Sequence, residues 1–232
     1  MVDLQVGWSE PVWAHHRGAH RGDQLVGADH PDAVTVALHR VDPVAVGLGD
    51  EKQTTLEGEI KRWTRAFETV DEAMNKRYLE AEELLFATMP PALPDAICHG
   101  DYRLGNMLCD GGDVAALIDW EIWSRSDPRL DLAWFLFFTE EAEHPMAMNP
   151  GPTGMPTATE LLDAYVGESG AEPANLDWFH ALIRYKEAAA TALLIKRALK
   201  NSGDTFSGTW EATIPACTTE CIRILEDFEP VS

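Results

Sequence analysis

The chain has 232 residues, of which 45% are hydrophobic, and its 39 acidic against 18 basic residues give a formal net charge of −21. This length suits one large domain or two small ones, and the hydrophobic share is typical of a globular protein. The acidic excess argues against binding to nucleic acid, which requires a basic surface. Because the sequence has no apolar run long enough to span a membrane and no signal-peptide pattern, we expect a cytoplasmic protein that binds neither nucleic acid nor membrane.

The first half of the chain predicts a poorly ordered start followed by helices. Residues 1–33 have no clear periodicity, and an exposed segment is the simplest interpretation. Residues 32–40 predict a short helix or strand. Thr54 or Thr55 is placed to cap a helix, and a second helix extends to about Ala87, before a Pro-rich stretch. Apolar residues recur along the first of these helices at three- and four-residue steps, at Ile60, Trp63, Phe67 and Val70.

The second half of the chain predicts three or four helices around a buried apolar segment. Residues 131–138 are too apolar for a surface helix and are expected beneath the site. Residues 140–156 are expected to form a long loop. Thr157 and Glu160 are spaced as a capping box. Two further helices are predicted over residues 175–200 and 209–228, so the fold class is α+β and mainly helical.

A short stretch between these halves predicts a β-hairpin. Residues 106–109 form one strand, residues 114–118 form the other, and two glycines supply the turn. A hairpin returns the chain to its starting point. We therefore expect Asn106, at the start of the first strand, to lie beside Asp119, which follows the second.

The polar residues around this hairpin predict phosphoryl-transfer chemistry. The carboxylate of Asp119 and the amide oxygen of Asn106 are the hard oxygen ligands that Mg²⁺ prefers. Asp101 lies a few residues upstream and is free to take a proton from a hydroxyl. A metal and a positioned base are what phosphoryl transfer requires, and the spacing D-x-x-x-x-N followed by an apolar strand ending in Asp is that of the protein-kinase catalytic loop.

Three motifs carry a resemblance to a known family: HGDYRLGN at residues 99–106, IDWE at 118–121 and DPRLDLA at 127–133. In this order they resemble the aminoglycoside phosphotransferase (choline kinase-like) family, and within it the kinase-like domain fused to some acyl-CoA dehydrogenases. The resemblance implies that Asp101 is the catalytic base and that Asn106 and Asp119 bind Mg²⁺ together with ATP or GTP. It also implies that Asp131 is a structural anchor for the catalytic loop.

The resemblance covers about residues 38–228, which correspond to the C-terminal lobe of a protein kinase-like fold. The family's β-rich N-terminal lobe carries a Gly-rich loop and a strand lysine, but no G-x-G-x-x-G and no lysine precede Lys52. We therefore expect residues 38–232 to form this lobe and residues 1–37 to be a remnant or replacement of the other. A fragment, a degenerate relative, and a lobe supplied by a partner chain remain three open explanations.

Three hypotheses for function follow. The first is a phosphotransferase that moves the γ-phosphate of ATP to a hydroxyl of an aminoglycoside-like or hydroxyacyl compound, and that could be inactive as a truncated chain. The second is a non-catalytic binding or regulatory module derived from the lobe, with its exposed surface covered by a protein partner or a second copy. The third is a metal-dependent hydrolase that uses the same carboxylates.

The remaining residues of the loop and the four cysteines have simpler interpretations. His99 is expected to order the loop by hydrogen bonding, and Tyr102 and Arg103 to line the cleft. Cys98 and Cys109 are expected to be small buried side chains on strands, with their thiols reduced.

Overall fold

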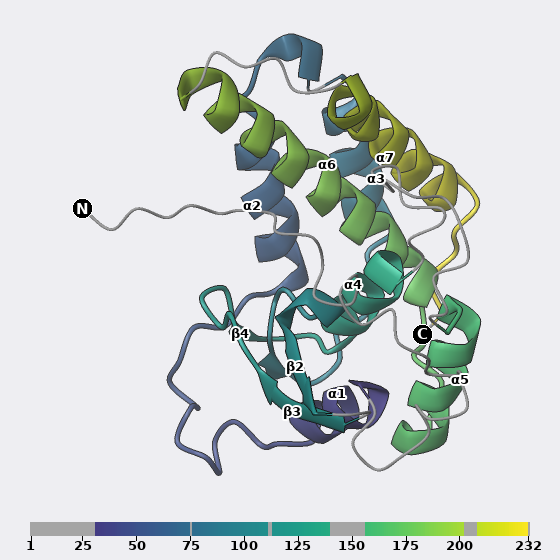
Figure 1. Cartoon of the computed structure of the whole chain (residues 1–232). Helices are drawn as coiled ribbons and strands as arrows, with labels where there is room; N and C mark the ends of the chain where they lie inside the picture. The colour runs from purple at the N-terminus through teal and green to yellow at the C-terminus, as the bar shows by residue number, and fades with distance from the viewer. Residues whose placement is uncertain (1–30, 75, 111–112, 140–155, 202–207, 232) are drawn as a thin grey trace.

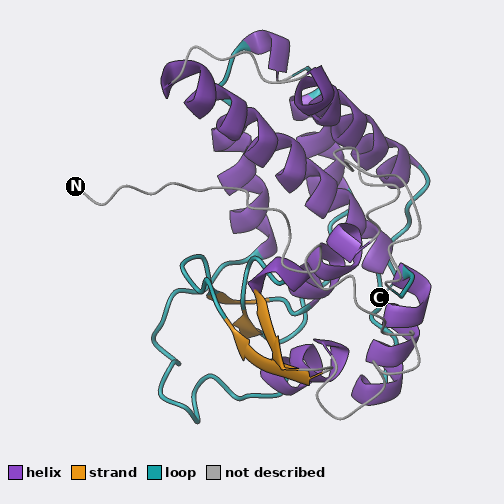
Figure 2. Ribbon diagram, viewed as in Figure 1, coloured by secondary structure: helices purple, strands orange, loops and turns teal. Residues whose placement is uncertain are grey.

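The computed structural model describes residues 31–231, except for residue 75 and residues 111–112, 140–155 and 202–207. Most of the predicted exposed segment at residues 1–33 and most of the predicted loop at residues 140–156 therefore lie outside the described residues. Helices dominate what is described, and the strands gather at one end of the molecule (Figure 2).

The described elements confirm a mainly helical α+β protein (Figure 1). The helices are α1 (Pro31–His39), α2 (Leu56–Phe67), α3 (Tyr78–Ala87), α4 (Arg129–Thr139), α5 (Ala158–Ser169), α6 (Leu176–Asn201) and α7 (Gly208–Glu226). The strands are β1 (Ala96–Cys98), β2 (Met107–Asp110), β3 (Asp113–Leu117) and β4 (Ser124–Ser126). Two short 3-10 helices, η3 (Glu72–Met74) and η4 (Leu104–Asn106), complete the list.

The long helix α6 is the centre of the main hydrophobic core. It packs against α2, α3, α4 and α7, and its path across the molecule is visible in Figure 1. Trp178, Phe179 and Tyr185 are fully buried along it. Apolar burial on this scale is the main driving force for folding, so α6 is the element against which the others are fixed.

The predicted first long helix is confirmed as α2. Thr55 is its N-cap, and the side-chain oxygen of Thr55 accepts a hydrogen bond from Gly58 N at 3.0 Å. Ile60, Trp63 and Phe67 are buried on one face, as their spacing predicts. The capping box that begins α5 is also confirmed, with Thr157 and Glu160 satisfying each other's backbone donors.

The predicted hairpin is confirmed as the antiparallel pair β2–β3, with Met107 opposite Leu117 and Leu108 opposite Ala116. Because side chains alternate along a strand, the two faces differ. Met107 is buried in a second, smaller core cluster, whereas Leu108 is 48% exposed and Ile118 is 40% exposed.

A second small sheet, β1 with β4, was not predicted. Ala96 pairs with Ser126 and Cys98 with Ser124 in antiparallel register. This pairing places the end of β1, where the catalytic loop starts, opposite the start of β4, and the chain continues from the end of β4 into α4. The two small sheets thus hold both ends of the loop that carries Asp101.

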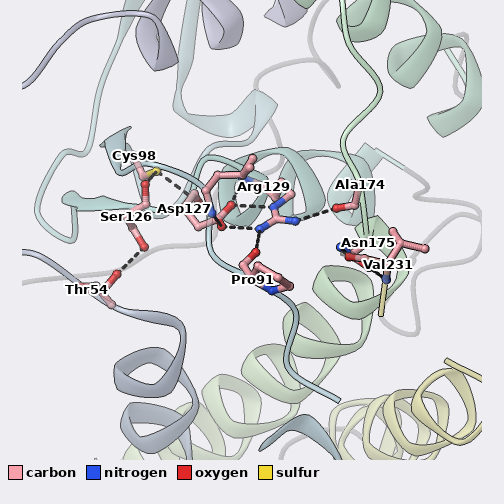
Figure 3. A network of polar contacts seen from close by, with 10 residues as sticks. Thr54, Pro91, Cys98, Ser126, Asp127, Arg129, Ala174, Asn175 and Val231 are labelled. Carbon is pink, nitrogen blue, oxygen red and sulfur yellow. Dashed lines mark hydrogen bonds and ion pairs between the residues drawn. The ribbon is translucent and has the colours of Figure 1, made fainter. Parts of the chain in front are cut away.

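A buried ion pair joins this sheet to the helical core (Figure 3). Asp127 and Arg129 are each 2% exposed in their side chains, and Arg129 Nη2 lies 2.7 Å from Asp127 Oδ2. The guanidinium also donates to the carbonyl oxygens of Pro91 and Ala174. One side chain therefore links the start of α4 to the segments before β1 and before α6.

Candidate active site

Asp131 on α4 fixes the start of the catalytic loop. Its Oδ2 accepts a hydrogen bond from His99 N at 2.6 Å, and its Oδ1 accepts one from Gly100 N at 2.9 Å. Asp131 is 1% exposed, so both contacts are shielded from water. These contacts are those of the structural anchor that the family resemblance implies.

The His99 ring links the loop to the hairpin. Its Nε2 lies 2.8 Å from the carbonyl oxygen of Ile118, and its Nδ1 accepts a hydrogen bond from Asp101 N at 3.3 Å. Since Nδ1 accepts, the neutral ring carries its proton on Nε2 and donates to Ile118. The ring thus orders the loop, as expected, and has no free nitrogen for acid–base work.

Asp101 is held by three hydrogen-bond donors. Asn106 Nδ2 donates to its Oδ2 at 2.8 Å, Trp134 Nε1 donates to its Oδ1 at 2.8 Å, and Arg103 Nε lies 3.1 Å from both oxygens. Burial alone would raise the pKa of Asp101, but the charge of Arg103 and the hydrogen bonds from Trp134 and Asn106 outweigh it. The pKa of this carboxyl is therefore lowered, and the group is ionised at neutral pH.

Asn106 and Asp119 occupy neighbouring positions at the end of the hairpin. The carbonyl of Asn106 accepts a hydrogen bond from Ile118 N at 3.0 Å, so Asp119 directly follows the residue paired with Asn106. The side-chain nitrogen of Asn106 donates two hydrogen bonds to Asp101, one to its carboxylate and one to its backbone carbonyl oxygen. The amide oxygen of Asn106 is therefore the atom of this side chain that could hold a metal.

The backbone of Asp119 is unusual. Its φ is 68°, in the left-handed region that residues with a side chain seldom adopt. Asp119 is exposed, next to the half-buried Trp120. Non-glycine residues in this conformation concentrate at functional sites, where the fold holds them in place. The donor set of Asn106 and Asp119, one amide and one carboxylate oxygen, fits Mg²⁺.

Behind the anchor lies a histidine at the end of α1. His39 on α1 has a side chain that is 6% exposed, and its Nε2 lies 3.5 Å from Asp131 Oδ2. Cys98 Sγ belongs to the same buried group. Neither ring nitrogen of His39 has a hydrogen-bond partner among the described residues. This contact places α1 directly against the residue that anchors the loop.

Two of the expectations for neighbouring residues were wrong. Tyr102 does not line a cleft: it is fully buried, with its ring 5.4 Å from that of Phe135. Cys109 is not buried: it is exposed on β2. Arg103, in contrast, does lie at the site, in its ion pair with Asp101.

Two residues of the site were not found from sequence. Trp134 lies in the apolar segment at residues 131–138 that was expected to be buried, but its indole also donates to Asp101. Lys186 on α6 donates to the carbonyl oxygen of Gly100 at 2.7 Å. Since 86 residues separate these two positions, no local pattern predicts the contact.

The chain belongs to the phosphotransferase enzyme family (APH), because the family's sequence model matches residues 28–179. This match includes the catalytic loop, the hairpin and the start of α6. The mainly helical architecture with two small sheets is the kinase-like fold of that family.

Known relatives agree with this assignment. The chain is 27% identical over 184 residues to mouse acyl-CoA dehydrogenase family member 11, a match that covers 72% of this chain and 22% of the relative. A solved structure described as an aminoglycoside phosphotransferase from Ralstonia eutropha is 20% identical with a TM-score of 0.67, over 90% of this chain and 66% of that one. A choline/ethanolamine kinase family protein from Mesorhizobium loti is 20% identical with a TM-score of 0.55, over 88% of this chain and 67% of that one.

The matched proteins are longer than this chain. The chain spans about a fifth of the mouse relative and just under two thirds of the Ralstonia protein. Within the described parts of the chain, no helix is both long and apolar enough to cross a membrane.

Proposed function

We propose that the chain transfers the γ-phosphoryl group of Mg-ATP to a hydroxyl of a small molecule. The observation that carries the proposal is the double use of Asn106, which donates to Asp101 through nitrogen and keeps its oxygen for a metal. The proposed base and one proposed metal ligand are therefore a single hydrogen-bonded unit. Phosphoryl transfer depends mainly on such positioning.

Each residue has a defined task in the proposed reaction. Asp101 accepts the proton of the attacking hydroxyl, whose oxygen forms a bond to the γ-phosphorus. The bond from that phosphorus to the β,γ-bridging oxygen breaks, and ADP leaves. Asn106 and Asp119 would bind Mg²⁺, which neutralises charge on the phosphate oxygens when bound. The pKa of Asp101 lies below its usual range, which keeps the base ionised and ready for the proton.

The exposed end of the hairpin supports a nucleotide as the donor. Leu108 and Ile118 are exposed apolar residues at the end of the hairpin that follows Asn106, and Ile118 N donates to the Asn106 carbonyl oxygen. An apolar surface beside two oxygen ligands suits a molecule with a flat base and a charged phosphate chain. We propose that the base covers Leu108 and Ile118.

For the acceptor we propose a hydroxylated acyl compound, in preference to an aminoglycoside. Two cationic groups lie beside the proposed base: Arg103, which pairs with Asp101, and Lys186 behind it. These charges would repel a polycation. Trp134, which is 6% exposed, packs against Phe138 with the rings tilted at 56° and their centroids 4.6 Å apart, so the proposed base is backed by aromatic side chains, which suits an apolar acceptor. A relative named for acyl-CoA dehydrogenase is consistent with this choice.

The test is calorimetric titration of Mg-ATP into the wild type, Asp119→Ala and Asp113→Ala. Asp113 is an exposed carboxylate at the far end of the same hairpin and is the matched control. We expect binding that weakens by about tenfold or more in Asp119→Ala, a loss of about 1.4 kcal/mol, and is unchanged in Asp113→Ala. ADP release should then depend on an added hydroxyacyl compound.

The outcomes separate the hypotheses. Binding without ADP release, whatever the acceptor, would favour the alternative of a non-catalytic binding module. No binding at millimolar nucleotide would exclude the phosphotransferase for this chain.

A further inference from the structure

Lys186 is a buried cation in an unusual environment. It is 7% exposed on α6. Its ammonium donates to the carbonyl oxygen of Gly100 and lies 3.6 Å from the centre of the Trp134 ring. It thus contacts a carbonyl and an aromatic face instead of a carboxylate. Burying an ammonium group without a paired charge is costly, so its position calls for an explanation.

Both contacts of Lys186 lead to Asp101. The carbonyl of Gly100 belongs to the peptide group that joins Gly100 to Asp101. The hydrogen bond from Lys186 therefore fixes the orientation of the peptide plane that precedes Asp101. The amide of Gly100 is held on its other side by Asp131. The indole of Trp134, on whose face the ammonium lies, donates its N–H to Asp101 Oδ1.

We propose that Lys186 is a positioning residue for the base, which it orients through the Gly100 carbonyl and through the indole N–H of Trp134. A cation on the face of an indole draws electron density from the ring and strengthens the ring's N–H as a donor. This inference rests on the proposed function only for the role of Asp101. The orientation of the carboxylate is a property of the protein without any ligand.

The electrostatics of the pair agree with this assignment. The charge of Lys186 contributes to the lowered pKa of Asp101. Burial lowers the pKa of Lys186, whereas the carboxylates of Glu59, Asp101 and Asp131 raise it and Arg62 lowers it further. Loss of the ammonium would therefore make Asp101 easier to protonate.

The direct test follows the hydrogen bond from Trp134 to Asp101 in the protein without nucleotide. In protein labelled with ¹⁵N at the indole nitrogens, the Trp134 N–H signal is assigned by its loss in Trp134→Phe. We expect Lys186→Met to move the proton shift of this signal upfield, because the N–H then donates more weakly to Asp101 Oδ1. Lys196→Met is the matched control, because Lys196 is exposed on the same helix and also donates to a backbone carbonyl, that of Thr69. Its Trp134 signal should equal that of the wild type.

A second variant guards against loss of folding. Lys186→Gln removes the charge from the face of the Trp134 ring but keeps a donor for the Gly100 carbonyl, and it should move the indole signal in the same direction. An unchanged Trp134 signal in a folded Lys186→Met or Lys186→Gln variant would overturn the proposal. This holds even if the wild type transfers no phosphate, so failure of the inference is distinct from failure of the proposed function.

Turnover, if detected, gives a further criterion. We expect Lys186→Met to lower kcat by about tenfold or more, with a smaller change in KM for ATP, because the misplaced group is the base. The acid limb of the pH profile should move to higher pH, and Lys186→Arg should restore part of the rate. Equal kcat values and equal acid limbs in Lys186→Met and the wild type would contradict a positioning role.

Discussion

Gly100 lies between two side chains that approach it from different helices. The carboxylate of Asp131 on α4 accepts a hydrogen bond from the Gly100 N–H, and the ammonium of Lys186 on α6 donates one to the Gly100 carbonyl oxygen. Its φ is +85°, and a Cβ at this position would lie 2.6 Å from the carbonyl oxygen of Ile122. A side chain here would have to displace backbone, so the close approach and the positive φ both require glycine.

Gly100→Ala is therefore expected to destabilise the protein more than a glycine substitution at an open site. Gly47→Ala is the matched control, since its φ is +81° and nothing lies within 4 Å of the added Cβ. Both variants incur the left-handed penalty of about 1–2 kcal/mol. Only Gly100→Ala adds a clash, so its loss in the free energy of unfolding in urea should exceed that of Gly47→Ala by about 1 kcal/mol or more. Equal losses would mean that the loop moves freely away from Ile122.

At the level of elements, the ion pair of Asp127 and Arg129 connects parts of the chain that are far apart in the sequence. Arg129 is also 4.3 Å from the centre of the Phe179 ring on α6. The guanidinium thus contacts α6, the segment before it, and the Pro-rich segment after α3 (Figure 3). Removing one partner would leave the other charged and buried.

Arg129→Met is expected to lower the free energy of unfolding by about 3–5 kcal/mol, the typical cost of leaving a buried charge unpaired. The control is Arg223→Met on α7, where the ion pair with Glu220 is exposed and screened by solvent, so its loss should change stability far less. Chemical unfolding of both variants measures the contrast. Similar losses for the two arginines would show that the buried ion pair stabilises the fold no more than the exposed one does.

The elements also show which features can be predicted from sequence. α2, α5, α6 and the hairpin follow from local spacing, caps and turn residues, and all four are confirmed. The pairing of β1 with β4 depends on residues about 28 positions apart, and neither strand has an alternating pattern that would predict it. Three residues per strand are too few for such a pattern.

The residues of the candidate site also differ in whether the sequence predicts them. The loop residues and the anchor Asp131 are close in sequence and belong to motifs. Trp134 and Lys186 reach Asp101 from helices whose side chains look apolar or solvent-exposed in the sequence. Their contacts depend on how α4 and α6 cross beneath the loop, which local periodicity does not determine.

At the scale of the whole molecule, acidic residues outnumber basic ones, which gives a net charge of −21 and a sequence pI near 4.6. One acidic group differs from the rest because it is inside. Glu187 on α6 is 5% exposed, and burial raises its pKa to about 7, against the opposing effects of the hydrogen bond from Thr191 and the charge of Lys186. The folded chain therefore holds a proton here that the unfolded chain releases near pH 4.5.

The sign of the resulting pH dependence follows from linkage. Between about pH 4.5 and pH 7 the folded state binds more protons at Glu187 than the unfolded state does, so this residue lowers stability as the pH rises. Glu187→Gln should remove this dependence and be more stable than the wild type at pH 8, by roughly 3 kcal/mol. The two proteins should be similar near pH 4.5.

Urea unfolding at several pH values measures this difference. Glu83→Gln is the control, because Glu83 is exposed on α3 and should leave the pH dependence unchanged. A wild type and a Glu187→Gln variant with parallel pH profiles would mean that Glu187 is ionised in the folded protein.

The four cysteines of the chain differ in accessibility. Cys98, Cys217 and Cys221 are buried, and burial raises the pKa of all three thiols. Cys109 is exposed on β2, directly after Leu108. A maleimide dye should therefore label the native protein at one position without any mutagenesis. Its fluorescence would report, in real time, on whatever molecule binds at the hairpin.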